Sequence, residues 1–247
     1  MSTAAIPVHV GLVDETREID PTELATMAGA MSEQIQHDFA PVWHVRASVA
    51  AYPAAPASTW VVHIQTQLDQ PGALGYHTDD HHQPLAYVEL TADWTVTVSH
   101  EVLEMLADPW GSRLHKAELP AGVEGNHAQF GLASARGRVS YLLEVCDPCE
   151  ATSYAVGGQQ LSDFLLPSWY RTSPSPALAY SQVGGCVKPR EVADGGYVSF
   201  GAPTGEWFQV FNQGGQLTIK DLGKFNKAQY GSLREWTDEK ARELRAG

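Results

Sequence analysis

The sequence predicts an α+β fold, with a mixed twisted sheet and two main helices in an N-terminal lobe and a smaller, hairpin-rich C-terminal lobe. Strand and helix patterns alternate over residues 1–110, an apolar helix carrying acids closes that region, and Gly-containing turns between short apolar runs follow it. With 247 residues and 43% hydrophobic content, the chain can build one sizeable core. We expect one domain, residues 1–247, with lobes 1–110 and 111–247.

The first two expected elements are a strand and a helix. Val8–Val13 is apolar and predicts a buried strand. Asp20 is a typical N-cap, Pro21 fits the first helical position and Glu23 the third, so a helix is expected to start there and to end near Pro41. Its apolar face repeats at helical spacing through Leu24, Met27, Ala28, Met31 and Ile35.

Four strand-like segments come next in the chain. They are His44–Ala50, Trp60–Gln67, the short Gly-punctuated segment Gly72–His77, and Leu85–Leu90. The loop between the first two holds prolines, which do not fit a central strand. A second helix, Thr97–Ala107, is expected immediately after the last strand.

This second helix carries a His-Glu-x-x-Glu motif, formed by His100, Glu101 and Glu104. Residues four apart lie one turn above each other, so His100 and Glu104 can bind one metal ion, while Glu101 faces the same cleft as a general base. The surrounding positions are apolar, and the segment Thr91–Pro109 contains no Lys or Arg. Burying carboxylates costs several kcal/mol unless they are paired or bind metal. A metal site or an acid network paired with Arg from elsewhere is therefore expected; the alternative is a surface helix with solvated acids.

The motif and the order of elements before it resemble the zincin metallopeptidases, in particular the metzincin branch. The order is strand, helix, strand, strand, short strand, strand and metal helix, and the resemblance covers roughly the first 110 residues. It implies an antiparallel edge strand near Gly72–His77 that pairs with the substrate backbone. The chain departs from the family pattern where Glu104 replaces a histidine ligand and where Ala107 and Trp110 replace the Gly and third His of metzincins.

A third ligand is expected from Tyr141–Glu150, an apolar run that leads into an Asp-Pro turn. Glu144 or Asp147 can complete a set of one histidine and two carboxylates, as the downstream Glu of gluzincins does, and both choices stay open. Asp147 can also simply cap its turn. The expected cofactor is one divalent metal ion, namely zinc.

Two further clusters can be interpreted as metal sites. Cys146 and Cys149 have the spacing of half a structural zinc site, with Cys186 as a distant third thiol, but the partner half is missing, so free thiols are expected. The run His77–His82 is expected to be a solvated tip between two strands. Alternatively, His77 lines the cleft as a proton donor or oxyanion partner.

The second half of the chain is expected to form hairpins and a final helix, all within the C-terminal lobe. Tyr154–Leu161 has a Gly-Gly turn, Gly195–Val210 reads as another hairpin, and Asp221–Arg245 is charged and helix-prone. Tyr154 and Tyr170 are candidates for a transition-state phenol or for core packing.

Charge and composition exclude several partner classes. A formal net charge of −13 disfavours nucleic acid and anionic membranes. The N-terminus lacks the features of a signal peptide, no apolar run reaches the ~20 residues that span a bilayer, and three cysteines suit a reducing compartment, so a cytoplasmic location is expected. The sequence leaves the oligomeric state open.

The sequence as a whole predicts a metal-dependent hydrolase of peptides or small amides. Glu101 would take the proton of the attacking water, with His77 assisting and the metal held by His100, Glu104 and Glu144 or Asp147. The alternatives are a zincin-like binding protein without catalysis and a metal-dependent enzyme of another class.

Overall fold

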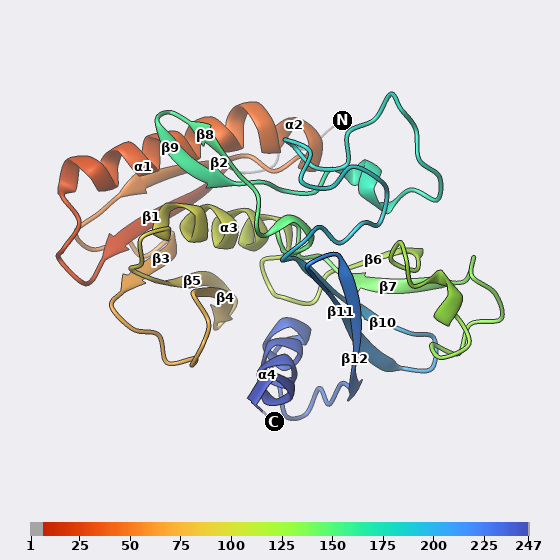
Figure 1. The fold of residues 1–247 in the computed structure, drawn as a ribbon. Helices are drawn as coiled ribbons and strands as arrows, with labels where there is room; N and C mark the ends of the chain where they lie inside the picture. Colours follow the sequence, from red (N-terminus) through yellow and green to blue (C-terminus); the bar gives the residue numbers. More distant parts are fainter. Residues whose placement is uncertain (1–6, 247) are drawn as a thin grey trace, which may run out of the picture. The chain divides into compact units, whose positions relative to one another are not determined.

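The computed structural model describes residues 7–246, with side chains up to residue 243, and shows a fold of the α+β class. The chain divides into two compact units, whose elements are labelled in Figure 1. Unit 1 contains the described residues up to Trp110 together with Ser153–Ser162. Unit 2 contains Gly111–Thr152 together with the residues from Asp163 onward.

Unit 1 is built on a five-stranded mixed sheet in the order β2-β1-β3-β5-β4. Neighbouring strands are parallel except β4, which is antiparallel to β5 and lies at the edge. The five strands expected from the sequence are thus confirmed, with shifts of a few residues at their ends. They are β1 (Val8–Asp14), β2 (Ala47–Ala51), β3 (Trp60–Gln65), β4 (Gly75–Asp80) and β5 (Gln83–Glu89).

Helix α1 (Pro21–Gln34) starts where the capping pattern predicts, because the Asp20 side chain accepts a hydrogen bond of 2.7 Å from the Thr22 N–H. The helical path ends at Trp43, near Pro41 as expected, but it is not one regular helix. A π-helical turn, Ile35–Phe39, follows α1, and α2 (Ala40–Trp43) carries Pro41 in its first turn. A proline at that position needs no N–H partner, so the helical path continues past it.

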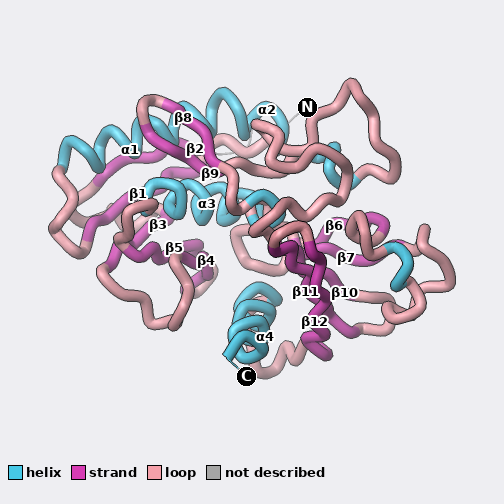
Figure 2. Tube along the Cα trace, viewed as in Figure 1, coloured by secondary structure: helices cyan, strands magenta, loops and turns pink. Residues whose placement is uncertain are grey.

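Helices α1 and α3 (Trp94–Ala107) lie on the same face of this sheet, as Figures 1 and 2 show. Helix α1 packs on β2, and α3 packs on β4 and β5. The two helices are joined directly by the Ser99 hydroxyl, which donates to Gln34 Oε1 over 2.9 Å. The core between helices and sheet is apolar and fully buried, and it includes Leu12, Met27, Val62, Ile64, Ala86, Val88 and Val98.

The hairpin β8 (Ser153–Val156) and β9 (Gln159–Ser162) belongs to unit 1, although the sequence placed it in the C-terminal lobe. Its Gly-Gly turn is confirmed by φ angles of 55° and 85°. Buried polar groups dock it: Gln34 Nε2 donates to the Ser162 carbonyl over 3.0 Å and to the Tyr154 hydroxyl over 3.2 Å. The Ser162 N–H donates to Ser99 Oγ over 3.1 Å. These long-range bonds decide the hairpin's location, and they steady α3 one residue before His100.

Unit 2 contains an antiparallel five-stranded sheet in the order β12-β11-β10-β7-β6 and the C-terminal helix α4. Short 3-10 turns lie between its strands at Glu124–Asn126, Asp147–Cys149 and Pro167–Tyr170. The elements are β6 (Leu114–Glu118), β7 (Arg138–Leu142), β10 (Tyr197–Gly201), β11 (Glu206–Gln213), β12 (Gln216–Lys224) and α4 (Leu233–Ala246).

The final helix is shorter than expected. Asp221 and the residues up to Lys224 extend β12, because this strand pairs with the whole length of β11, and helix α4 begins only at Leu233. The helix closes an apolar cluster on the sheet in which Trp207 and Trp236 meet edge to face, with ring centroids 6.4 Å apart. Among the described residues, no helix is long and apolar enough to cross a membrane.

Candidate functional site

Helix α3 buries the acids of the motif. Glu104 is 0% exposed and Glu101 3%, while the His100 side chain is 12% exposed. The helix ends at Asp108, whose N–H donates to the Glu104 carbonyl over 2.7 Å, and Pro109 prevents its continuation. The expected helix with an acid stripe is therefore present, and the alternative of a surface helix with solvated acids is wrong.

His77 is buried on β4, so the expectation that the whole run from His77 to His82 forms a solvated tip is wrong for this residue. The strand continues to Asp80, and Asp80, His81 and His82 are exposed. The register pairs His77 with Ala86, whose side chain belongs to the helix-covered face of the sheet. Because side chains alternate along a strand, His77 points toward α3.

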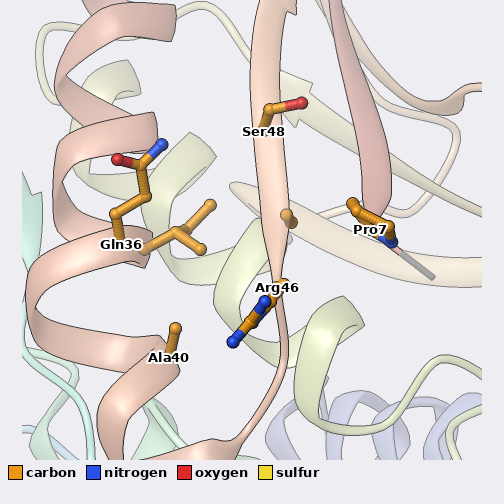
Figure 3. A pocket seen from close by; sticks show the side chains of 7 residues that line it. Pro7, Gln36, Ala40, Arg46 and Ser48 are labelled. Atoms are coloured by element: carbon orange, nitrogen blue, oxygen red, sulfur yellow. The ribbon is translucent and has the colours of Figure 1, made fainter. Parts of the chain in front are cut away.

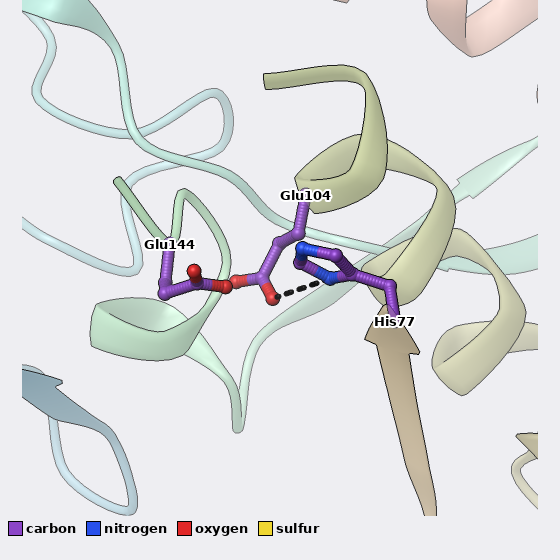
Figure 4. Close-up of side chains that lie close together, drawn as sticks. All are labelled: His77, Glu104 and Glu144. Carbon is purple, nitrogen blue, oxygen red and sulfur yellow. Dashed lines mark ion pairs between the residues drawn. The ribbon is translucent and has the colours of Figure 1, made fainter. Parts of the chain in front are cut away.

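Four residues singled out from the sequence meet in unit 1. His77 Nδ1 lies 3.5 Å from Glu101 Oε2 and 3.9 Å from Glu104 Oε2, the second pair being the dashed line in Figure 4. His100 Nε2 lies 3.4 Å from the same Glu104 oxygen. Glu104 thus has one imidazole on its own helix and another on the edge strand.

These separations are longer than those of other histidine–carboxylate pairs in the same unit. His63 Nδ1 lies 2.6 Å from Glu15 Oε1, and His81 Nδ1 lies 2.6 Å from Asp80 Oδ1, both being direct hydrogen bonds. Ligands of one tetrahedral zinc ion are separated by about 3.3 Å, since each lies about 2.0–2.1 Å from the metal. The spacing of His100 and Glu104 fits metal ligands better than a direct hydrogen bond.

Gly75, which sequence reasoning did not single out, makes room for Glu101. A Cβ atom at this position would lie 2.9 Å from Glu101 Oε1 and 2.7 Å from Thr97 Cγ2, so the strand backbone passes directly over the acid. Glycine is the residue that allows such an approach. The Gly-punctuated segment before His77 was the available signal, but only the strand register shows which glycine faces the helix.

The other two predicted ligands, Glu144 and Asp147, belong to unit 2 and are buried there. Glu144 follows β7 and forms an ion pair with Arg234 of α4, which also contacts Asp238 over 3.3 Å. Asp147 is the first residue of the 3-10 turn Asp147–Cys149. Burial, followed by the charge of Asp147, raises the pKa of the Tyr197 hydroxyl well above its usual value. The structure thus supplies an arginine partner for one of the two acids.

The three cysteines are free and buried, as the sequence led us to expect. The groups of metal-capable side chains found among residues 7–246 contain no cysteine. A hydrogen bond with Cys186, and then burial, raise the pKa of the Cys149 thiol well above its usual value. A thiol in this state is a poor metal ligand and a poor nucleophile.

The tyrosines proposed as transition-state phenols have structural partners. The Tyr154 hydroxyl donates to Asp38 Oδ2 over 2.9 Å and ties the hairpin to the π-helical turn. Tyr170 is buried in unit 2, and its ring contacts that of His115 in a tilted arrangement with a centroid distance of 4.1 Å. Both contacts favour the packing role.

A pocket of about 330 Å³ in unit 1 lies beside the π-helical turn (Figure 3). Gln36, Arg46 and Ser48 provide its polar lining, and the other lining residues are apolar. Its lining, as far as the structure describes it, contains neither an acid nor a histidine. It therefore lacks the groups that proton transfer or metal binding needs.

Comparison with known proteins gives no functional assignment, since no family model, curated protein or solved structure matches the chain.

Proposed function

We propose that the protein is a zincin-like, metal-dependent hydrolase that cleaves peptides or small amides. The observation that carries this proposal is the position of two buried carboxylates, Glu101 and Glu104, against the imidazoles of His77 and His100 at 3.4–3.9 Å. Burying such charges costs several kcal/mol unless a cation compensates them. A divalent ion between imidazole and carboxylate supplies that compensation.

The proposed ligands in unit 1 are His100 and Glu104, one turn apart on α3. The third ligand remains the one expected from the sequence, Glu144 or Asp147. Glu144 already has Arg234 as an ion-pair partner, which favours Asp147. Imidazole and carboxylate ligands suit zinc, and the large share of carboxylate also suits harder divalent ions.

The roles of the other residues follow from their positions. A divalent ion at these ligands supplies positive charge that polarises the carbonyl under attack. Glu101 accepts a proton from the attacking water and passes it to the leaving amine, so the water oxygen joins the carbonyl carbon as the C–N bond breaks. His77 lies 3.5 Å from Glu101 and either orients this acid or donates a proton to the oxyanion.

The position of β4 supports an extended substrate. This strand is antiparallel to its only sheet neighbour in the described part of unit 1, and it carries His77. A peptide backbone that pairs with its outer edge would lie along the strand that contacts both acids. The zincin resemblance implies the same mode of binding.

Substitution of Glu101 tests the proposal. Glu101→Gln keeps the shape of the side chain but removes the base, so kcat/KM on a peptide and amide library should fall at least 100-fold, or about 2.7 kcal/mol in barrier. Metal content and the circular dichroism spectrum should not change. Glu33→Gln, at an exposed position of α1, is the matched control and should keep full activity.

Two results would count against catalysis. If the metal-loaded protein cleaves nothing across a broad panel, or if Glu101→Gln cleaves as well as the unmodified chain, hydrolysis is wrong and the binding-protein alternative replaces it. In that case peptides from the same panel should bind the metal-loaded protein without being cut, which isothermal titration calorimetry measures.

A further inference from the structure

One oxygen of Glu104 is shared by two imidazoles from different elements. His100 Nε2 lies 3.4 Å from Glu104 Oε2 and belongs to the preceding turn of α3. His77 Nδ1 lies 3.9 Å from the same oxygen and belongs to β4. The Glu104 and His77 side chains have no exposed surface. Each imidazole therefore forms a separate nitrogen–oxygen pair with this carboxylate.

Both pairs have a spacing that a metal ion can occupy, but one ion does not fit both. Two ligands of an ion with bonds of about 2.1 Å can be no more than about 4.2 Å apart. Among the described residues, the groups of three or more metal-capable side chains whose ligand atoms all lie within 4.8 Å of one another each contain Glu104 and one histidine. None of these groups contains both His77 and His100. The nitrogens are therefore too far apart to bind the same ion.

We infer that Glu104 bridges two divalent ions, one held by His100 and the other by His77. This inference rests on the proposed function and deepens it, because His77 becomes a ligand of a second ion. Paired ions in hydrolases lie about 3.5–4 Å apart and act on both the attacking and the leaving group. A carboxylate between two imidazoles is a suitable bridge for such a pair.

Glu101 keeps its proposed role in this arrangement. It lies 3.5 Å from His77 Nδ1, yet it belongs to none of the metal-capable groups that the described residues form. Its carboxylate faces the strand backbone at Gly75. The inference therefore adds a second ion without removing the base.

The number of bound ions tests the inference. Protein stripped with a chelator is loaded with Zn²⁺, freed of excess metal, and measured by mass spectrometry and by calorimetric titration. The unmodified chain should bind two ions, and His77→Ala and His100→Ala should each bind one. Glu104→Gln should weaken both sites at least tenfold. His9→Ala, at an exposed position of the same sheet, is the matched control and should bind two.

Loading with Mn²⁺ gives a second readout that does not depend on activity. Paramagnetic resonance should show two coupled ions in the unmodified chain and an isolated ion in His77→Ala. If the unmodified chain binds only one ion, and this ion is kept in His77→Ala but lost in His100→Ala, the bridge is wrong and the proposed function still stands. A single ion that is lost in both variants would also show that the bridge is wrong. If the unmodified chain binds no Zn²⁺, both the bridge and the proposed function are wrong.

Discussion

Both units bury a carboxylate next to a cationic or basic side chain, but they use different partners. In unit 2, Glu144 is 6% exposed and pairs with Arg234, which is 4% exposed. In unit 1, Glu104 is 0% exposed and its ion pairs are with the imidazoles of His77 and His100. An arginine keeps its charge at any pH a protein tolerates, whereas an imidazole can lose its proton and offer a lone pair to a metal.

Under the proposed function, the difference separates a structural ion pair from a metal-binding site. The arginine pair lies within unit 2 and joins α4 to the segment after β7. The imidazole pairs of unit 1, at 3.4–3.9 Å, are longer than charge-assisted hydrogen bonds of about 2.7–2.9 Å, and a metal ion fits between nitrogen and oxygen at this spacing. The two regions should therefore respond differently to metal, and the following changes test that contrast.

The largest effect is expected from Arg234→Met. It leaves Glu144 buried without its guanidinium partner, which should lower the free energy of unfolding by about 3–5 kcal/mol, equally with Zn²⁺ and with chelator. Urea denaturation measures the loss. Lys240→Met on the same helix removes a solvent-accessible ion pair with Glu243 and should cost far less. If the loss of unfolding free energy in Arg234→Met depends on Zn²⁺, the ion pair of unit 2 also responds to metal and the contrast between the units is wrong.

The next effect is expected at Glu104 and depends on metal. Zn²⁺ at 100 times its dissociation constant should add about 2.7 kcal/mol per site to the free energy of unfolding of the unmodified chain. At the same Zn²⁺ concentration, Glu104→Gln, with sites at least tenfold weaker, should gain no more than about 1.4 kcal/mol per site. In chelator the variant should be at least as stable as the unmodified chain, because it no longer buries a negative charge. Equal stabilisation of both proteins by Zn²⁺ would contradict a metal role for this residue.

The part of the site predicted from the sequence is the part that local geometry determines. Helical periodicity alone places His100 and Glu104 one turn apart, and the apolar residues around them predict burial. The N-cap at Asp20 and the Gly-Gly turn were predicted for the same reason, since each depends on residues adjacent in the chain. The order of the strands before α3 also followed from their apolar runs.

The remaining features depend on contacts between distant segments. Whether His77 belongs to a tip or to a buried strand depends on where the turn falls, and a shift of one residue would point its side chain to the other face. The approach of Gly75 to Glu101 follows from the same register. No local sequence pattern indicates that the Gln34 side chain donates a hydrogen bond to the carbonyl of Ser162 in the hairpin, 128 residues away.

The smallest effect is expected at His115, the histidine of unit 2 that lies among cations instead of acids. Partial burial, followed by the charges of Arg138 and Arg113, lowers the pKa of its imidazole in the folded state. As the pH falls, His115 therefore binds a proton near pH 6.5 in the unfolded chain but only at lower pH in the folded chain. The stability that His115 contributes is complete above pH 6.5 and decreases as the pH falls below it.

Replacing His115 should remove this pH dependence. In chelator, His115→Gln should lose less stability than the unmodified chain between pH 7.5 and pH 5, by less than about 1 kcal/mol because the side chain is exposed to solvent. Urea midpoints at the two pH values measure the difference. Arg138→Gln removes part of the cause, so the effect of His115→Gln should shrink in that background. If the pH dependence of stability is the same in His115→Gln and in the unmodified chain, the neighbouring arginines do not lower the pKa of this histidine. The contrast between the two units would then hold only for their buried acids.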